Sequence, residues 1–226
     1  METKIEQVRI DLTDRNRYMR KFFDEKADGF DDVHMSLMES KRAVTDALPE
    51  EVRTVLDLGI GTGMELYALT ERFPDVQITG IDISPAMTSY LKNRPFADRI
   101  TCIAGDFFET EFGTGYDAVI STSALHHFDA ASKAKLYEKI FACLHPGGYF
   151  VNSDRFADTE EEALEFYRYF LENPDRHGDT PLTVALETAL LSEAGFTDIR
   201  FLPVQTDRGY KCLVCRKGKQ DTGKQE

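Results

Sequence analysis

A short stretch near residue 60 constrains the fold of this chain more than any other part of the sequence. Residues 55–63 read VLDLGIGTG, an apolar run that leads into three glycines at every second position. Residues 64–73 then predict a helix with Leu66, Leu69 and Phe73 on one face. In an α/β fold, a strand, a glycine turn and a helix bring the backbone close to a nucleotide-like ligand. Glycine is needed there because a Cβ would block both the tight turn and the approach of the ligand.

The spacing of these glycines excludes two common nucleotide-binding motifs. The dinucleotide pattern G-x-G-x-x-G requires a glycine at position 64 or 66, and neither position is glycine. The phosphate-binding pattern G-x-x-x-x-G-K-[ST] is absent from the sequence. The pattern present is D-x-G-x-G-x-G, formed by Asp57, Gly59, Gly61 and Gly63. An acid before the first glycine suits a ligand that carries an amino group and a sulfonium, and it would repel a pyrophosphate.

This pattern resembles the first motif of the class I S-adenosylmethionine (SAM) dependent methyltransferases. The resemblance extends from about Val52 to Cys215. It implies an α/β fold with a doubly wound, mostly parallel, seven-stranded Rossmann-like sheet, helices on both sides and an antiparallel final hairpin. It also implies SAM as the cofactor and methyl transfer as the reaction. Because a fold does not fix an activity, the methyl acceptor has to be argued from the site.

Further residues match the cofactor-binding positions of the resembled family. Asp82 closes the predicted second strand 23 positions after Gly59, where a carboxylate accepts hydrogen bonds from both ribose hydroxyls. Asp106 ends the third predicted strand, where the family places an acid near the adenine amino group, and the backbone N–H of Phe107 is expected at an adenine ring nitrogen. The other expected contacts are Ile83 and Met87 at the adenine face and Ser121 and Thr122 at the SAM amino group. For the two apolar residues, packing in the core is an equally good interpretation.

Two adjacent histidines are candidates for the catalytic step. His126 and His127 follow the fourth predicted strand, where the resembled family brings the acceptor against the methionine part of SAM. A histidine there would act as a general base for a weakly nucleophilic acceptor, or it would only pack or cap. Asp154 and Arg155 stand at the carboxyl end of the fifth predicted strand and are expected at the substrate, since ligands bind at that edge of open α/β sheets.

Residues 1–50 precede the glycine motif and predict helices without strands, including one over 36–48 after a turn at 28–32. Two aromatic stripes have no obvious local partner: Tyr18, Phe22 and Phe23 in this segment, and Tyr167 and Phe170 in the helix expected over residues 159–171. We expect the stripes to meet over the site as a cap that shields the methyl group from water. The alternative is a structural appendage that covers a sheet edge.

Length and composition predict three parts of the chain and limit the kinds of molecule that it binds. The parts are a helical extension at 1–50, a SAM-binding domain at 51–216 and a disordered polar tail at 217–226. Lysine and arginine number 27 against 40 acids, so the net charge is −13 and nucleic acid is repelled on average. We therefore favour a small-molecule acceptor, a cytoplasmic location and no membrane span or signal peptide; a homodimer stays open.

Two other functions remain open. A transfer-RNA-modifying enzyme that uses SAM or a SAM derivative would need a basic surface, and its footprint would be Arg15, Arg17, Arg20 and Lys21. A regulator that binds SAM without catalysis is the other alternative.

The four cysteines do not predict a metal site. They are Cys102, Cys143, Cys212 and Cys215. The C-x-x-C pair at 212–215 lies on a predicted strand, where positions three apart point to opposite faces. No second pair completes a zinc site, so we expect buried, reduced thiols.

Overall fold

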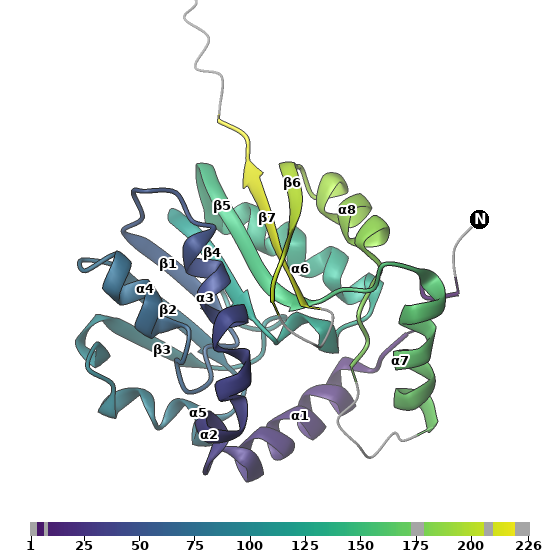
Figure 1. Ribbon diagram of the computed structural model, residues 1–226, viewed down its shortest axis with the longest axis horizontal. Helices are drawn as coiled ribbons and strands as arrows, with labels where there is room; N and C mark the ends of the chain where they lie inside the picture. Colours follow the sequence, from purple (N-terminus) through teal and green to yellow (C-terminus); the bar gives the residue numbers. More distant parts are fainter. Residues whose placement is uncertain (1–3, 7–8, 173–178, 206–209, 220–226) are drawn as a thin grey trace, which may run out of the picture.

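The computed structural model describes residues 4–6, 9–172, 179–205 and 210–219 (Figure 1). Seven strands form one sheet in the order β3-β2-β1-β4-β5-β7-β6. Their bounds are β1 Thr54–Leu58, β2 Gln77–Asp82, β3 Ile100–Ala104, β4 Tyr116–Thr122, β5 Leu144–Arg155, β6 Phe196–Pro203 and β7 Tyr210–Lys217. Strands β1 to β5 pair in parallel, and β7 is antiparallel to both β5 and β6. The expected mostly parallel seven-stranded sheet with an antiparallel final hairpin is confirmed.

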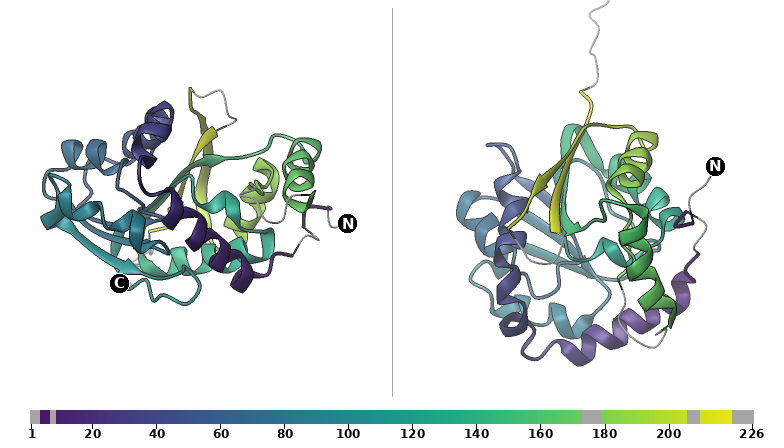
Figure 2. Two further views of the ribbon diagram at one scale, coloured as in Figure 1. Left: turned by 90° about the horizontal axis from the view of Figure 1, so that it is seen from below. Right: turned by 45° about the vertical axis from the view of Figure 1, so that its right-hand side comes forward.

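Eight α-helices among the described residues surround this sheet (Figures 1 and 2). They are α1 Leu12–Lys26, α2 Phe30–His34, α3 Met38–Asp46, α4 Leu66–Arg72, α5 Pro85–Thr88, α6 Ala130–Cys143, α7 Glu160–Glu172 and α8 Val184–Glu193. Four single 3₁₀ turns complete the set: η1 Met35–Leu37, η2 Leu91–Asn93, η3 Ala97–Arg99 and η4 Leu125–His127. No helix of the described residues is long and apolar enough to cross a membrane.

Three local differences from the sequence-based expectation have simple causes. The spacing of Leu136, Ile140 and Leu144 predicts a helix from Lys135. Helix α6 begins five residues earlier, because the Asp129 carboxylate caps it by accepting from the backbone N–H of Ser132 at 2.8 Å. The turn expected over 28–32 already ends at Gly29, whose φ of 72° separates α1 from α2. Of the tail expected over 217–226, Lys217 belongs to β7, and residues 220–226 lie outside the described part of the chain.

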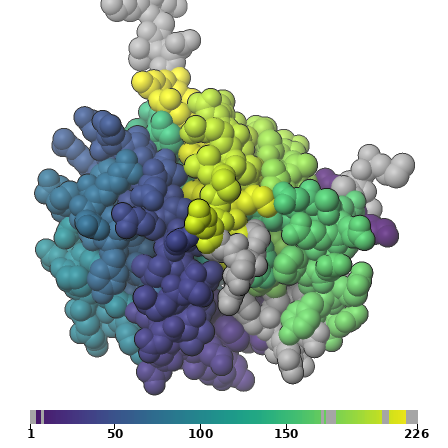
Figure 3. Space-filling view, viewed as in Figure 1, coloured from purple at the N-terminus to yellow at the C-terminus, as the bar shows by residue number. Residues whose placement is uncertain are grey.

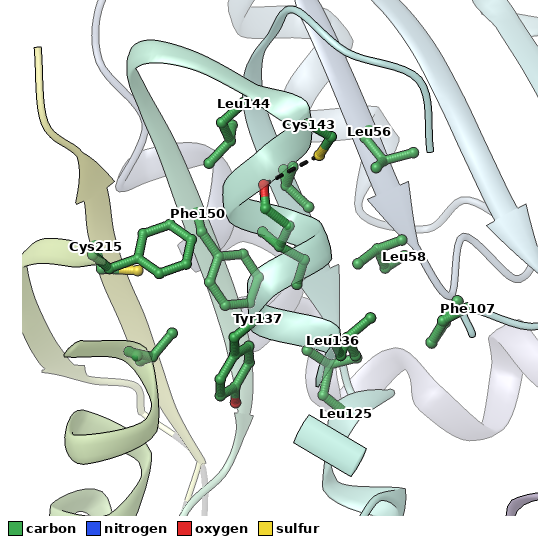
Figure 4. Packing of buried hydrophobic residues seen from close by; sticks show 14 of the residues in the cluster. Leu56, Leu58, Phe107, Leu125, Leu136, Tyr137, Cys143, Leu144, Phe150 and Cys215 are labelled. Atoms are coloured by element: carbon green, nitrogen blue, oxygen red, sulfur yellow. Dashed lines mark hydrogen bonds between the residues drawn. The ribbon is translucent and has the colours of Figure 1, made fainter. Parts of the chain in front are cut away.

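The hydrophobic core has two main halves, one on each face of the sheet. On one face, α6 and α8 cover β1, β4, β5 and β7, and Leu136 and Tyr137 of α6 pack in the same cluster as Phe150 of β5 (Figure 4). On the other face, α3 and α4 cover the sheet with residues such as Val44 and Leu69. The cysteine pair follows this division, because Cys215 belongs to the first half and Cys212 to the second.

Three of the four thiols are buried as expected, and burial raises the pKa of Cys143, Cys212 and Cys215. Cys102 differs, because its side chain is exposed on β3, a strand at the edge of the sheet.

A buried polar triad joins α6 to α8 within this packing. Lys133 Nζ and Tyr137 OH both donate to the carboxylate of Glu187. The three residues are at most 1% exposed. A buried ion pair of this kind contributes little net stability, but removal of one partner leaves a charge without compensation.

We therefore expect Glu187→Leu to lower the free energy of unfolding by about 3–5 kcal/mol, because the Lys133 ammonium stays buried without its partner. Urea denaturation followed by circular dichroism measures the loss. The double variant Lys133→Met/Glu187→Leu should recover most of it. An equal loss in the single and double variants would show that the charge is not the cause.

Candidate functional site

A cavity of about 910 Å³ runs along the carboxyl ends of strands β1 to β5. Its walls come from the glycine turn, the ends of β2, β3 and β4, the middle of α7, and the N-terminal helices α1 and α2. Figure 2 shows α1 crossing this end of the sheet, and in the space-filling view the N-terminal segment (purple) forms the lower surface (Figure 3). Ligands bind at this edge in open α/β sheets.

Two glycines of the turn, Gly61 and Gly63, have different structural roles. Gly61 has a φ of 49° and lines the cavity, where an added Cβ would lie 3.4 Å from Met87 Cε. Gly63 has a φ of 76°, and a Cβ there would lie 2.7 Å from Leu91 Cδ2, inside the packed protein. Both require the left-handed backbone that glycine tolerates. Gly61 therefore keeps the cavity open, whereas Gly63 permits the turn to pack.

Asp82 connects the glycine turn to the end of β2. Its Oδ2 accepts from the backbone N–H of Gly61 at 2.8 Å, and its Oδ1 accepts from the N–H of Ser84 at 2.8 Å. Burial raises the pKa of Asp82 to about 6, although these two hydrogen bonds favour the charged form. Each carboxylate oxygen has a further lone pair, so the side chain can accept two more donors from the cavity.

Eight of the eleven predicted cofactor residues line this one cavity. They are Gly59, Gly61, Asp82, Ile83, Met87, Asp106, Phe107 and Thr122. Asp106 also closes its own loop, since its Oδ1 accepts from the backbone N–H groups of Phe108 and Glu109 at 2.7 and 3.0 Å.

Three predicted cofactor residues lie outside the cavity lining. Gly63 packs against Leu91 as described, and Ser121 Oγ donates to the carbonyl of Leu58 at 2.8 Å. Asp57 is fully buried, and its side chain pairs with the carboxyl group of Glu65. Burial and the neighbouring Glu65 raise the pKa of Asp57 well above its ordinary value.

His126 lies between two carboxylates at the cavity wall. Its Nδ1 pairs with Asp154, and its Nε2 lies 3.2 Å from Asp179 Oδ1. Burial alone would lower the pKa of His126, but the two carboxylates outweigh it and raise the pKa to about 9. Asp154 is fixed in turn, because the backbone N–H groups of Leu125 and His126 donate to its Oδ2 at 2.9 and 3.1 Å. His126 is therefore an imidazolium at neutral pH.

His127 lines the same cavity but has different partners. Arg15 of α1 donates from Nε to the His127 carbonyl at 3.2 Å, and its Nη2 lies 3.4 Å from His127 Nδ1. The ring of Phe23 lies 6.1 Å from the imidazole, centroid to centroid. Burial lowers the pKa of Arg15 to about 10, although Asp179 opposes the shift. Arg15 is thus part of the site and not of an exposed basic surface.

The wall near the histidines is mainly aromatic. Its aromatic side chains are Phe22, Phe23 and Phe30 from the N-terminal segment, Phe128 after η4, Phe166 and Tyr169 from α7, and Tyr210 from β7. Arg155 pairs with Asp179 and places its guanidinium 4.9 Å from the centre of the Phe166 ring. Asp154, by contrast, lies behind His126 and is 1% exposed.

The two aromatic stripes meet only in part. Phe22 and Phe23 line the cavity, and Tyr18 stacks on Phe22 with 6.3 Å between ring centroids. Tyr167 differs from expectation, because it is 1% exposed and packs with Ala163 and Leu182 on the far side of α7. The adjacent Phe166 and Tyr169 face the cavity instead, and the side chain of Phe170 lies outside the described residues.

Sequence reasoning missed three polar residues at this cavity, whereas Thr122, expected at the SAM amino group, does line it. The missed residues are Lys41, Glu65 and Asp179. Only their tertiary neighbours reveal them, since Lys41 and Glu65 pair across 24 positions and Asp179 lies in a loop without a motif. Ser123 is a further case: its φ of 55° is rare for a residue with a Cβ, and such strain is concentrated at functional sites.

One group of potential metal ligands exists among the described residues. A ligand atom from each of His126, His127 and Asp179 lies within 4.8 Å of the others. Each is already engaged, however, and the guanidiniums of Arg15 and Arg155 beside them would repel a cation. We therefore assign this group as an ion-pair network.

We expect NMR titration of labelled histidine to give His126 a pKa of about 9 in the free protein. Asp179→Asn removes one of the two carboxylates, so the pKa of His126 should fall. His145, which pairs with Asp117 at the opposite edge of the sheet, is the control, and its resonances should be the same in both proteins. An unchanged His126 midpoint in the variant would refute the role of Asp179.

Comparison with known proteins gives a consistent result. A family model described as a methyltransferase domain matches residues 55–148. The malonyl-[acyl-carrier protein] O-methyltransferase of Priestia megaterium is 27% identical over 156 residues, which cover 67% of this chain and 56% of the relative. The carboxy-S-adenosyl-L-methionine synthase of Campylobacter concisus is 30% identical over 144 residues, which cover 61% of this chain and 60% of the relative. The chain thus matches less than two thirds of the length of either relative.

Among solved structures, human N-acetylserotonin methyltransferase in complex with SAM superposes with a TM-score of 0.69. The match covers 88% of this chain and 57% of the human chain at 24% identity, so it supports the fold.

Proposed function

We propose that this chain, which belongs to the class I SAM-dependent methyltransferases, transfers the methyl group of SAM to an oxygen of a small, largely apolar acceptor. The observation that carries this proposal is the shared cavity: the glycine turn and Asp82 lie at one end, and His126 with its two carboxylates lies at the other. Cofactor and acceptor can therefore meet in one space of about 910 Å³.

The residues of the nucleoside end fit SAM. Asp82 offers free lone pairs for the ribose hydroxyls, and Gly61 leaves the space that a Cβ would fill. Ile83, Met87 and Phe107 give apolar surface for the adenine. When bound, SAM supplies a methyl group that its sulfonium has already activated.

The protein's own task is then to align the acceptor and to exclude water. Alignment of two reactants is worth ~7–11 kcal/mol of the barrier. In this proposal residues 51–216 form the methyltransferase domain, and residues 1–50 are its cap. Two carboxylates hold the cap on the cofactor loops: Asp24 accepts from Ser84 Oγ at 2.6 Å, and Asp31 accepts from Thr62 Oγ1 at 2.6 Å.

His126 provides the proton chemistry in this proposal. In the free protein its Nε2–H donates to Asp179. An acceptor hydroxyl that takes the place of Asp179 removes one carboxylate from the imidazole, whose pKa then falls, and the Nε2 proton passes to solvent. Nε2 can then take the proton of the acceptor hydroxyl while Asp154 holds Nδ1–H in place. Arg155 retains Asp179 as its ion-pair partner throughout.

The aromatic wall supports an acceptor with a flat apolar body, because aromatic side chains favour stacked or edge-to-face contacts with rings. The Priestia megaterium relative is named an O-methyltransferase, which supports an oxygen acceptor.

The charge distribution does not favour transfer RNA as the acceptor. Arg15 is buried beneath the cavity wall. The three other basic residues of the expected footprint pair with acids on α1: Arg17 with Asp14, Arg20 with Asp24 and Lys21 with Glu25. A surface of paired charges gives little attraction for a phosphate backbone.

The ionisation of Asp82 predicts how cofactor binding depends on pH. Ribose hydroxyls donate to the carboxylate, so affinity for S-adenosylhomocysteine should be constant above pH 7 and fall as pH drops through about 6, where Asp82 gains a proton. Asp82→Asn should bind by about 1.5–3 kcal/mol less tightly at pH 8 and lose the dependence. Isothermal titration calorimetry measures both effects, with the exposed Asp75→Asn as the control. The assignment fails if NADH displaces the ligand or if the Asn variant keeps the pH dependence.

A radiolabelled-methyl assay tests the acceptor. SAM with a labelled methyl group is incubated with panels of small phenols, carboxylic acids, amines and thiols. Transfer to phenols is expected, and His126→Ala should lower its rate by about 10²–10⁴-fold because the general base is lost. His145→Ala serves as the matched control and should leave the rate unchanged. Transfer to amines or thiols alone, or an unchanged rate in His126→Ala, would contradict the proposal.

A further inference from the structure

The cavity contains a second ion pair that the chemistry above does not use. Lys41 of α3 and Glu65, the residue before α4, both line the cavity and form a salt bridge of 3.0 Å. Their side chains are 8% and 1% exposed. Thr122 at the end of β4 completes the cluster, since its Oγ1 donates to Glu65 Oε2 at 3.2 Å and lies 3.3 Å from Lys41 Nζ.

The cluster contains a second acid. Glu65 Oε2 accepts from Lys41 and Thr122, and the buried Asp57, whose raised pKa favours the neutral acid, hydrogen-bonds the Glu65 carboxylate. Burial of two charges costs several kcal/mol for each ion, and apolar residues in their place are often as stable or more stable. Stability alone therefore gives no reason for a buried ion pair at the wall of the cavity, whereas a ligand that carries both charges would give one.

The place of the pair along the sheet indicates which part of a ligand it would meet. Asp106 and Asp82 lie at the ends of β3 and β2, the glycine turn follows β1, Thr122 ends β4, and the His126–Asp154 pair lies at β5. Neighbouring parallel strands are about 4.8 Å apart, so these ends form a row. The Lys41–Glu65 pair thus lies between the nucleoside end of the cavity and its acceptor end.

We propose that Lys41 and Glu65 bind the zwitterionic end of the SAM methionine, Lys41 holding the α-carboxylate and Glu65 the α-ammonium. The inference rests on the proposed use of SAM. In the free protein the two side chains neutralise each other. When the ligand binds, each gains the opposite charge of the ligand, so no buried charge is left without a counterion. Lys41 belongs to the N-terminal segment, which therefore contributes to cofactor binding as well as to the cap.

Asp57 supports this division of charge. It is fully buried next to Glu65, and its raised pKa favours the neutral acid, which can donate to the Glu65 carboxylate. A neutral Asp57 leaves Glu65 as the carboxylate that faces the ligand ammonium.

Three ligands distinguish the proposed contact of Lys41 with the carboxylate from that of Glu65 with the ammonium. S-Adenosylhomocysteine carries both the α-carboxylate and the α-ammonium. Decarboxylated SAM carries the ammonium and the sulfonium but no carboxylate, and 5′-methylthioadenosine has neither the carboxylate nor the ammonium. Calorimetry on the full chain compares their affinities for wild type, Lys41→Met and Glu65→Gln. Two exposed neighbours are the matched controls, Arg42→Met on α3 and Glu71→Gln on α4.

Lys41→Met should lower the affinity for S-adenosylhomocysteine by about 10–150-fold, the range for a hydrogen bond to a charged group, and leave the other two ligands unchanged. Glu65→Gln should weaken S-adenosylhomocysteine and decarboxylated SAM and leave 5′-methylthioadenosine unchanged. Both control variants should bind as wild type does.

Other outcomes overturn the inference. Equal weakening of all three ligands would mean that the pair only supports the fold of the cavity, and unchanged affinities would mean that it does not touch the ligand. If a single variant fails to fold, Lys41→Met/Glu65→Leu leaves no buried charge and should bind S-adenosylhomocysteine no better than 5′-methylthioadenosine; a retained preference refutes the proposal. Wild type that binds none of the ligands would instead refute the use of SAM.

Discussion

The hydrogen bond from the backbone N–H of Gly61 to the Asp82 carboxylate is the contact on which the rest of the site depends. It joins the glycine turn after β1 to the end of β2, and the neighbouring bond from Gly59 N–H to the Ile81 carbonyl fixes the same junction at 2.8 Å. Both ends of the contact are set by parallel strand pairing, in which Leu58 lies opposite Ile81. A carboxylate that accepts from two backbone donors has one orientation, so the Asp82 side chain is held in place at this end of the cavity.

Buried charge is the second organising feature, and it is arranged in compensated groups along the same edge. Lys41 faces Glu65 near β4, and His126 faces Asp154 and Asp179 near β5. Each group costs desolvation energy that a purely structural protein could avoid with apolar side chains. Groups of this kind at one cavity are a common property of sites that bind or transfer charged ligand groups.

The N-terminal segment belongs to the site as much as the sheet does. Its carboxylates Asp24 and Asp31 bind the loops after β2 and β1, and Arg15 binds the His127 backbone. Lys41 extends the same segment to the edge of β4. A loss of order in this segment would therefore affect both ends of the cavity at once, because its contacts reach the glycine turn and the histidines alike.

Local pattern in the sequence determined the strands, the glycine turn and the positions of Asp82 and the two histidines, because these depend on residues close in the chain and on the parallel order of the strands. Only the tertiary structure decided which side chains pair with one another in the cavity. The pairing of Lys41 with Glu65 and the place of Asp179 beside His126 result from elements that pack across many positions. The rotation of α7 likewise turned Phe166 toward the cavity and Tyr167 away from it, because adjacent residues on a helix point about 100° apart. Sequence fixes which side chains stand at the end of a strand, and packing fixes which charges meet there.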